Sequence, residues 1–362
     1  MACTALALVA DSTMIYYALF FFAEGALLLF ANLMRRRALG LIAAAVAIAF
    51  CGFRYETGYD YNSYRDFFED IEIYEAKLEP GFNFLVYLAN TVEVPTFGLF
   101  FLFSLMTHGL AYLALSKMST SPNLAFLLYL LIPGLYLNSF SVIRSGFAVA
   151  VFGYAVFKLI SSGRRLEYVA WGVLAISFHY TAVLPFFVAF MIFLAPKGLP
   201  SRHACILLLI TSLLASQLPI AQTILNTFGG TRFDSYAEMR DSQNALKIFA
   251  FNLLALFIIF RSRYFKDNKC LMFYFKIWLV GVLLFNTFIE FSAVTRINYY
   301  FGFFSIPLVI CAASAHGRLG QLIGQSALIV FFSASFMVAL YNDTLVADPL
   351  NMSNYKTIFD LP

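Results

Sequence analysis

Residues 95–116, PTFGLFFLFSLMTHGLAYLALS, decide the class of fold. The segment contains no Asp, Glu, Lys or Arg, and it supplies the ~20 predominantly apolar residues that an α-helix needs to cross a membrane. The rest of the chain has the same character, because 61% of its residues are hydrophobic, only 12% are charged and the mean hydropathy is +0.80. A soluble protein of this size does not need so much apolar surface. No alternating strand pattern is present, so helices must satisfy the backbone in lipid.

Apolar segments recur along the chain and predict an all-α, polytopic membrane protein with about 12 crossings. We expect one transmembrane domain, residues 1–362. Several segments are shorter than a straight spanning helix, which predicts short or re-entrant helices. The predicted spans lie near residues 14–34, 38–53, 95–116, 122–138, 144–160, 166–178, 180–195, 204–225, 246–260, 270–290, 297–315 and 321–341.

Basic residues predict the orientation in the membrane, because an excess of Lys and Arg marks the cytoplasmic side. They fall in alternate connections, at Arg35-Arg36-Arg37, Lys117, Lys158, Arg164-Arg165, Lys197, Arg202, the 261–269 cluster and Arg318. Both termini and two loops, residues 54–81 and 226–246, are then expected on the outer face. Residues 82–93 are too short to span, and counting them as a crossing would invert every later basic cluster. We therefore expect a re-entrant or interfacial helix there.

Arginines at the outer ends of apolar segments predict an anion-binding site. Arg54, Arg144 and Arg296 each lie at such an end, where a charge is costly unless it is paired, solvated or bound to an anion. Other charged or titratable residues of the predicted outer face are Asp60, Glu79, His179 and Arg232. The sequence contains no P-loop, Rossmann glycine pattern, HExxH motif or Cys/His metal spacing. Neutralising an anion such as pyrophosphate would therefore fall to the arginines.

The first motif is RYETGYDYNSY, residues 54–64, and EPGF, residues 79–82, follows it. Tyrosines among carboxylates on an outer loop suit a carbohydrate, because rings contact sugar CH groups and carboxylates accept bonds from hydroxyls. The alternative is a solvated acidic loop. Arg54 beside Gly58 and Asp60 at the membrane boundary favours the binding surface.

The second motif, NSFSVIRSGFA, covers residues 138–148. An Arg in the first turn of a helix opposes the helix dipole, so Arg144 is expected to have a partner. That partner is either a phosphate, which free backbone N–H groups would also bind, or a structural pair with Glu79 or Glu290.

Three further segments contain residues whose roles the sequence leaves open. His179, near the outer boundary between two short apolar segments, is a candidate proton acceptor or phosphate ligand, or a histidine hydrogen-bonded within the bundle. Arg296, with Tyr299, lies at the start of another predicted span. Glu24, in the middle of the first span, either pairs within the bundle or serves a proton-coupled carrier.

Taken together, four landmarks resemble the EpsG/Wzy-like family of bacterial polysaccharide polymerases. In chain order they are Arg54-x3-Gly58-x-Asp60-x3-Tyr64 with Glu79-Pro80-Gly81-Phe82, Ile143-Arg144-x3-Ala148, Phe178-His179-x2-Ala182, and Arg296-x2-Tyr299. One departure is Ser145, where the family often has Gln.

The resemblance implies a metal-independent glycosyltransferase of the multi-span, GT-C-like type, without a cofactor, in the bacterial inner membrane and acting on the periplasmic face. Its relatives join undecaprenyl-pyrophosphate-linked repeat units into O-antigen or exopolysaccharide, and a chain-length regulator is a possible partner; a nucleic acid is not. Pyrophosphate and sugar would be bound by Arg54, Arg144, Arg232, Arg296, Tyr64 and Tyr299. Asp60, slightly preferred, or His179 would be the base, and Glu79 would position an arginine or sugar.

Other classes remain open from the sequence. A glycan ligase shares the chemistry and differs in its acceptor. A transporter or flippase of lipid-linked sugars would also need a cationic cavity, but it favours charges along a path across the bundle, whereas here they crowd at one face. A non-catalytic component of an assembly complex is a third class.

Overall fold

The computed structural model describes residues 2–34, 36–75, 78–195, 198, 200–218, 245–289, 292–314, 317–346, 348 and 350–360. Within these residues, six helices are long and apolar enough to cross a membrane. They are α1 (Ala2–Leu33), α6 (Thr96–Met118), α9 (Ile143–Ser162), α15 (Ala245–Arg261) with the 3-10 turn Ser262–Phe265 that continues it, α16 (Lys269–Thr287) and α19 (Gly317–Thr344). The protein is thus an all-α, multi-pass membrane protein, as predicted.

A further apolar helix pair is bent, and it is either a broken seventh span or a re-entrant loop. Helices α17 (Ser292–Gly302) and α18 (Ser305–Ala313) form one apolar segment that is bent by 43° at the break. The remaining predicted spans correspond to shorter helices: α2 (Arg37–Gly52), α7 (Pro122–Leu131), α10 (Arg165–Phe178), α11 (Val183–Leu194) and α12 (Arg202–Ala215). The total of 12 crossings stays a prediction, because helices of this length do not by themselves span a bilayer.

Local sequence sets the helix boundaries. Pro80 and Pro122 occupy first-turn positions, where the missing N–H is not needed. Asn268 caps α16 by accepting hydrogen bonds from two backbone N–H groups. Gly163 ends α9 in the left-handed conformation, at φ 67°. Pro133 follows the end of α7, so helix covers only the first part of the predicted span 122–138, and the segment resumes as the short helix α8 (Asn138–Ser141).

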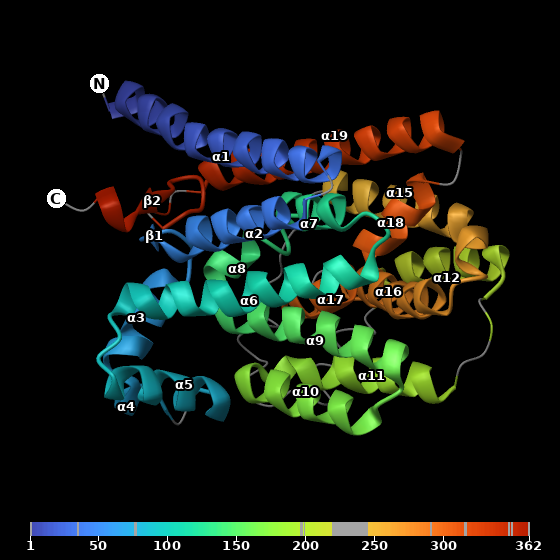
Figure 1. Cartoon of the computed structure of the whole chain (residues 1–362), viewed down its shortest axis with the longest axis horizontal. Helices are drawn as coiled ribbons and strands as arrows, with labels where there is room; N and C mark the ends of the chain where they lie inside the picture. Colours follow the sequence, from blue (N-terminus) through green and yellow to red (C-terminus); the bar gives the residue numbers. More distant parts are fainter. Residues whose placement is uncertain are drawn as a thin grey trace.

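The long helices run roughly side by side, and the two ends of the bundle differ (Figure 1). One end carries β1 (Arg54–Tyr55), α3 (Tyr61–Glu69), α4 (Ile71–Tyr74) and α5 (Pro80–Thr91). The connections α1–α2, α6–α7 and α9–α10 lie toward the opposite end, and these hold predicted cytoplasmic basic residues. We call the first end the outer end.

The outer end is more ordered than the sequence suggested. The region expected to be a loop, residues 54–81, folds into β1, α3 and α4, and α5 supplies the short helix expected over 82–93. Strand β1 pairs in antiparallel fashion with β2 (Lys356–Thr357), which the sequence did not indicate. Beneath them, the rings of Phe68, Phe82, Phe100 and Phe103 pack against one another. This aromatic layer fixes the outer helices on α6.

Helix α9 is the centre of the bundle. It packs against α6 and α10, and 67% of its span is buried, compared with 17% for α19. The site described next is built around the outer end of this helix.

Candidate functional site

Glu79 lies at the point where α5 begins, next to the end of α10. Pro80 starts α5, and Gly81 lies so close to α10 that a Cβ atom there would stand 2.4 Å from the Ser177 Oγ and 2.8 Å from the Ser177 carbonyl oxygen. The Glu-Pro-Gly motif therefore has a physical reason: only glycine allows this approach, which brings Glu79 to His179 at the end of α10.

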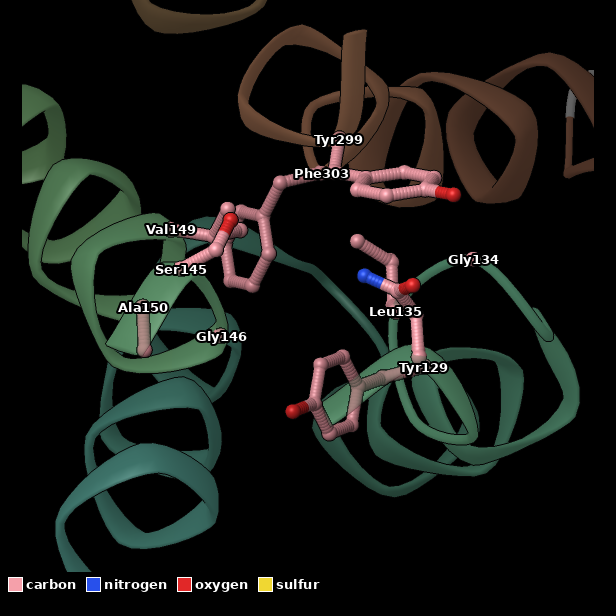
Figure 2. Close-up of a pocket in the computed structure, with 10 residues that line it drawn as sticks. Tyr129, Gly134, Leu135, Ser145, Gly146, Val149, Ala150, Tyr299 and Phe303 are labelled. Atoms are coloured by element: carbon pink, nitrogen blue, oxygen red, sulfur yellow. The ribbon is translucent and has the colours of Figure 1, made fainter. Parts of the chain in front are cut away.

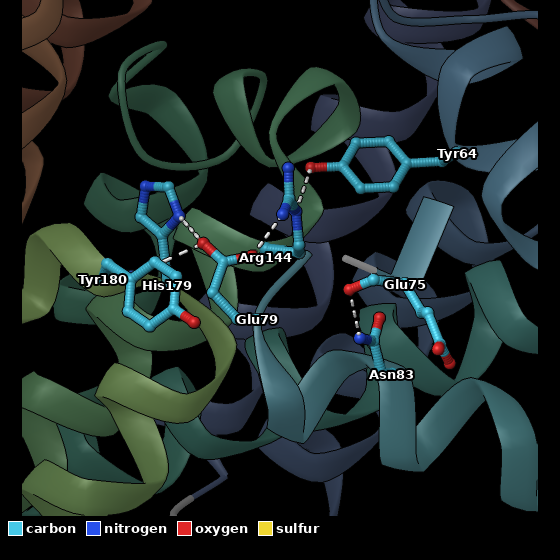
Figure 3. A network of polar contacts seen from close by, with 7 residues as sticks. All are labelled: Tyr64, Glu75, Glu79, Asn83, Arg144, His179 and Tyr180. Atoms are coloured by element: carbon cyan, nitrogen blue, oxygen red, sulfur yellow. Dashed lines mark hydrogen bonds and ion pairs between the residues drawn. The ribbon is translucent and has the colours of Figure 1, made fainter. Parts of the chain in front are cut away.

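Glu79 joins Arg144 and His179 in one network (Figure 3). One carboxylate oxygen, Oε2, forms an ion pair with Nη1 of Arg144. The other, Oε1, lies 3.2 Å from Nδ1 of His179 and accepts a 3.4 Å hydrogen bond from the backbone N–H of Tyr180. The Glu79 side chain is only 7% exposed, whereas those of Arg144 and His179 are 20% and 23% exposed. The carboxylate is therefore internal, and its two partners reach the surface of the site.

Arg144 is held by aromatic residues as well as by charge. Its Nε donates a hydrogen bond of 3.3 Å to the Tyr64 hydroxyl, and the rings of Tyr64, Phe67 and Phe82 lie 5.4–6.0 Å from its guanidinium carbon. Its Nη2 has no hydrogen-bond partner within the described residues. Nε and Nη1 are thus engaged, while Nη2 is available to bind an anion.

His179 has its two ring nitrogens in different surroundings. Nδ1 faces the Glu79 carboxylate, and the other nitrogen points away from it (Figure 3). A carboxylate beside Nδ1 favours the tautomer that carries its proton there. In the neutral ring Nε2 is then an acceptor, as a general base requires.

The pKa directions of the two acids differ. Burial raises the pKa of Glu79, but the hydrogen bond from His179, the charge of Arg144 and the charge that His179 carries when it is protonated bring it below its ordinary value. Burial also raises the pKa of Asp60, and there the charges of Arg296 and Arg144 only partly oppose the rise. Both arginines thus lie close enough to act on Asp60, although no hydrogen bond or ion pair joins them among the described residues.

Arg54, predicted to bind anions, lies inside the protein. It is 1% exposed and donates hydrogen bonds to the carbonyl oxygens of Cys51 (2.6 Å), Thr57 (3.2 Å) and Phe140 (3.0 Å). Gly58 has φ +107°, and a Cβ there would meet the Phe140 carbonyl oxygen at 2.5 Å. The Arg54-x3-Gly58 spacing therefore builds a turn against α8 and delivers Asp60 to the site.

The other predicted residues have different surroundings. Arg296 is exposed on α17, and Tyr299, one turn later, lines a small pocket. The pocket lies between the α7–α8 connection, the start of α9 and α17 (Figure 2), and its other lining residues include Gly134, Asn138, Ser145, Gly146 and Phe303. Two of these lining residues, Ser145 and Gly146, directly follow Arg144 in the chain. Arg232 and Glu290 lie outside the described residues.

Sequence reasoning did not identify several contacts of this site. The Tyr180 N–H, the rings of Phe67 and Phe82 around Arg144, and the buried state of Tyr64 depend on packing between distant segments. In the part of the chain that the structure describes, no group of three or more His, Cys, Asp or Glu residues could hold a metal ion. Glu24 is fully buried, and its carboxylate oxygens have no hydrogen-bond partner within that part of the chain.

A sequence model of the EpsG family matches residues 37–357, nearly the whole chain. The chain belongs to the EpsG family. Membership supports a general role as a glycosyltransferase-type polysaccharide polymerase that uses lipid-linked glycans. The four motifs of the outer end all lie within the matched region. No curated protein and no solved structure matches this EpsG-family chain.

Proposed function

We propose that this protein polymerises undecaprenyl-pyrophosphate-linked oligosaccharide repeat units into O-antigen or exopolysaccharide at the outer, periplasmic face of the bacterial inner membrane. The observation that carries the proposal is the Arg144–Glu79–His179 network at the outer end of α9. It combines a held cation, an internal carboxylate and a histidine whose Nε2 has no hydrogen-bond partner among the described residues. A transfer from a pyrophosphate leaving group to a sugar hydroxyl needs a charge stabiliser and a base.

The arginines would stabilise the leaving group. Arg296 is exposed, and Arg144 keeps Nη2 available, so both could contact the donor pyrophosphate as its bond to the anomeric carbon breaks. Negative charge then accumulates on the departing pyrophosphate, and two guanidinium groups would supply this stabilisation without a metal ion. Tyr299 would contact the adjoining sugar from the pocket, and Arg232 is a further candidate for the same anion.

His179 is our preferred base, which reverses the order expected from the sequence. As the acceptor oxygen bonds to the anomeric carbon, its proton would pass to Nε2 of His179, and Glu79 would stabilise the resulting imidazolium. Asp60 is the second candidate, because its raised pKa also suits proton transfer. In this proposal Arg54 and Tyr64 position the turn and Arg144, and they do not bind the anion.

The test is polymerisation by purified protein on a synthetic lipid-linked repeat unit. We expect Arg144→Ala and Arg296→Ala to leave a folded protein that yields only single-repeat product. His179→Gln should lower turnover by about 10²–10⁴ while substrate binding persists. Normal turnover of His179→Gln with an inactive Asp60→Asn would assign the base to Asp60. Normal long glycan from both arginine variants would remove them from the mechanism.

The same assay separates the alternatives. A ligase would transfer glycan to a lipid A core acceptor but would not extend it, and a flippase would move lipid-linked sugar without changing it. A proton-coupled carrier would depend on the buried carboxyl of Glu24, so Glu24→Gln would abolish transport. For a polymerase we expect Glu24→Gln to retain activity. A chain-length regulator would change the length distribution of the product, not its linkage.

A further inference from the structure

The C-terminal residues return to the outer end and pack against the turn that carries Asp60. Strand β2 pairs with β1, so that Arg54 lies opposite Thr357 and Tyr55 opposite Lys356. The Gly58 N–H donates a 2.8 Å hydrogen bond to the carbonyl oxygen of Leu350. These contacts join positions about three hundred residues apart in the chain, and they hold the turn at residues 54–58 in place.

A second set of contacts anchors this segment in the bundle. The ring of Tyr355 is 3% exposed and stacks on Phe50 at 4.2 Å, and its hydroxyl donates a 2.7 Å hydrogen bond to the Phe50 carbonyl oxygen. The Tyr17 hydroxyl donates a 2.8 Å hydrogen bond to the carbonyl oxygen of Met352. The C-terminal segment, residues 350–358, is therefore fixed to α1 and α2, and it can hold the residues that it contacts in place.

The contact closest to the site is made by Tyr59, which directly precedes Asp60. Its N–H donates a 3.1 Å hydrogen bond to Oγ of Ser141, and its hydroxyl donates one of 2.5 Å to Oδ1 of Asp343 at the end of α19. The other oxygen of Asp343 accepts a 2.6 Å hydrogen bond from the Ser353 N–H. Asp343 thus connects the C-terminal segment to the residue adjacent to Asp60.

We propose that the Tyr59–Asp343 hydrogen bond, supported by the C-terminal residues 350–358, is a positioning device that sets the place of Asp60 at the outer end of the bundle. This inference rests on the proposed function for its kinetic consequences. Neither Tyr59 nor Asp343 needs to touch substrate. Burial and the Asp343 carboxylate raise the pKa of Tyr59, so its hydroxyl keeps the proton that it donates.

The first experiment does not depend on activity. Hydrogen–deuterium exchange of the purified full chain in detergent would compare wild type with Tyr59→Phe, which removes only the hydroxyl. We expect residues 54–62 to exchange about tenfold faster, while the peptides of α6, α9 and α16 remain unchanged. Tyr87→Phe is the matched control, since Tyr87 also donates a 2.5 Å hydrogen bond to a carboxylate, that of Glu75, at an exposed position. Unchanged exchange at 54–62 in Tyr59→Phe would overturn the proposal.

The second experiment measures turnover on the synthetic lipid-linked repeat unit in a double-mutant cycle. We expect Tyr59→Phe and Asp343→Ala each to lower kcat by about ten- to a hundredfold with little change in KM, because a small misplacement of a reacting group is costly. The double variant should be no worse than Asp343→Ala alone, because Asp343→Ala already removes the hydrogen bond from the Tyr59 hydroxyl, together with the one from the Ser353 N–H. Additive losses, or full turnover in both single variants, would contradict the positioning role. If wild type itself shows no polymerisation, the proposed function fails, whereas the exchange result still decides whether the bond orders the turn.

Discussion

At the scale of the residue, the protonation of Glu79 links the site to the stability of the fold. Its pKa is lowered below the ordinary value of 4.5, so the folded state favours the carboxylate. The network therefore contributes stability above pH 4.5, and this contribution is lost as the pH falls through the lowered pKa. We predict that Glu79→Gln lowers the thermal unfolding midpoint at neutral pH, with a difference from wild type that shrinks below pH 4.5. A constant difference across that range would contradict the linkage.

The dependence of stability on pH has the opposite sign at Asp60. Its pKa is raised, so the folded state favours the protonated acid, and stability is lost as the pH rises through the raised pKa. Replacing the carboxylate by the neutral amide removes the cost of burying a charge. We predict that Asp60→Asn has a higher unfolding midpoint than wild type at neutral pH, although its turnover falls. If the midpoint falls instead, attraction to Arg144 and Arg296 outweighs the burial cost.

At the scale of the element, the approach of α5 to α10 creates the network. A side chain at Gly81 would collide with both the hydroxyl and the backbone of Ser177, and the backbone cannot move away by changing rotamer. We predict that Gly81→Ala destabilises the protein by about 1–3 kcal/mol and lowers turnover, because Glu79 is displaced from His179. Gly109→Ala is the control: nothing lies within 4 Å of a Cβ there, and alanine is the better helix former. Equal effects of the two variants would show that helix packing does not set the site.

At the scale of the whole molecule, the site is built at one end of the bundle. We predict that this end faces the periplasm, because the connections α1–α2, α6–α7 and α9–α10, with their basic residues, lie toward the other end. An impermeant thiol reagent should label Ser63→Cys and Ser242→Cys in cells with a permeabilised outer membrane, while Ser162→Cys stays protected. Ser242 lies outside the described residues, so its labelling tests the sequence-based topology alone. Labelling only at position 162 would invert the orientation.

The sequence by itself determined the class of protein and the positions of its long apolar helices. Hydrocarbon cannot hydrogen-bond the backbone, so a long apolar run such as 95–116 has essentially one solution, and helix α6 (Thr96–Met118) has nearly those bounds. Local chemistry also located the motif residues that form the site, since Gly58 and Gly81 both proved to lie at close backbone contacts.

Only the tertiary structure decided which charges are internal and which face the site. Arg54 and Arg144 look alike in sequence, yet carbonyl oxygens of Cys51, Thr57 and Phe140 surround the first, whereas Glu79 holds one edge of the second. The pairing of β1 with β2 likewise gave no sequence signal. The physical reason is that a buried polar group takes whichever partner packing brings within hydrogen-bond distance, and these partners are up to about three hundred residues away along the chain.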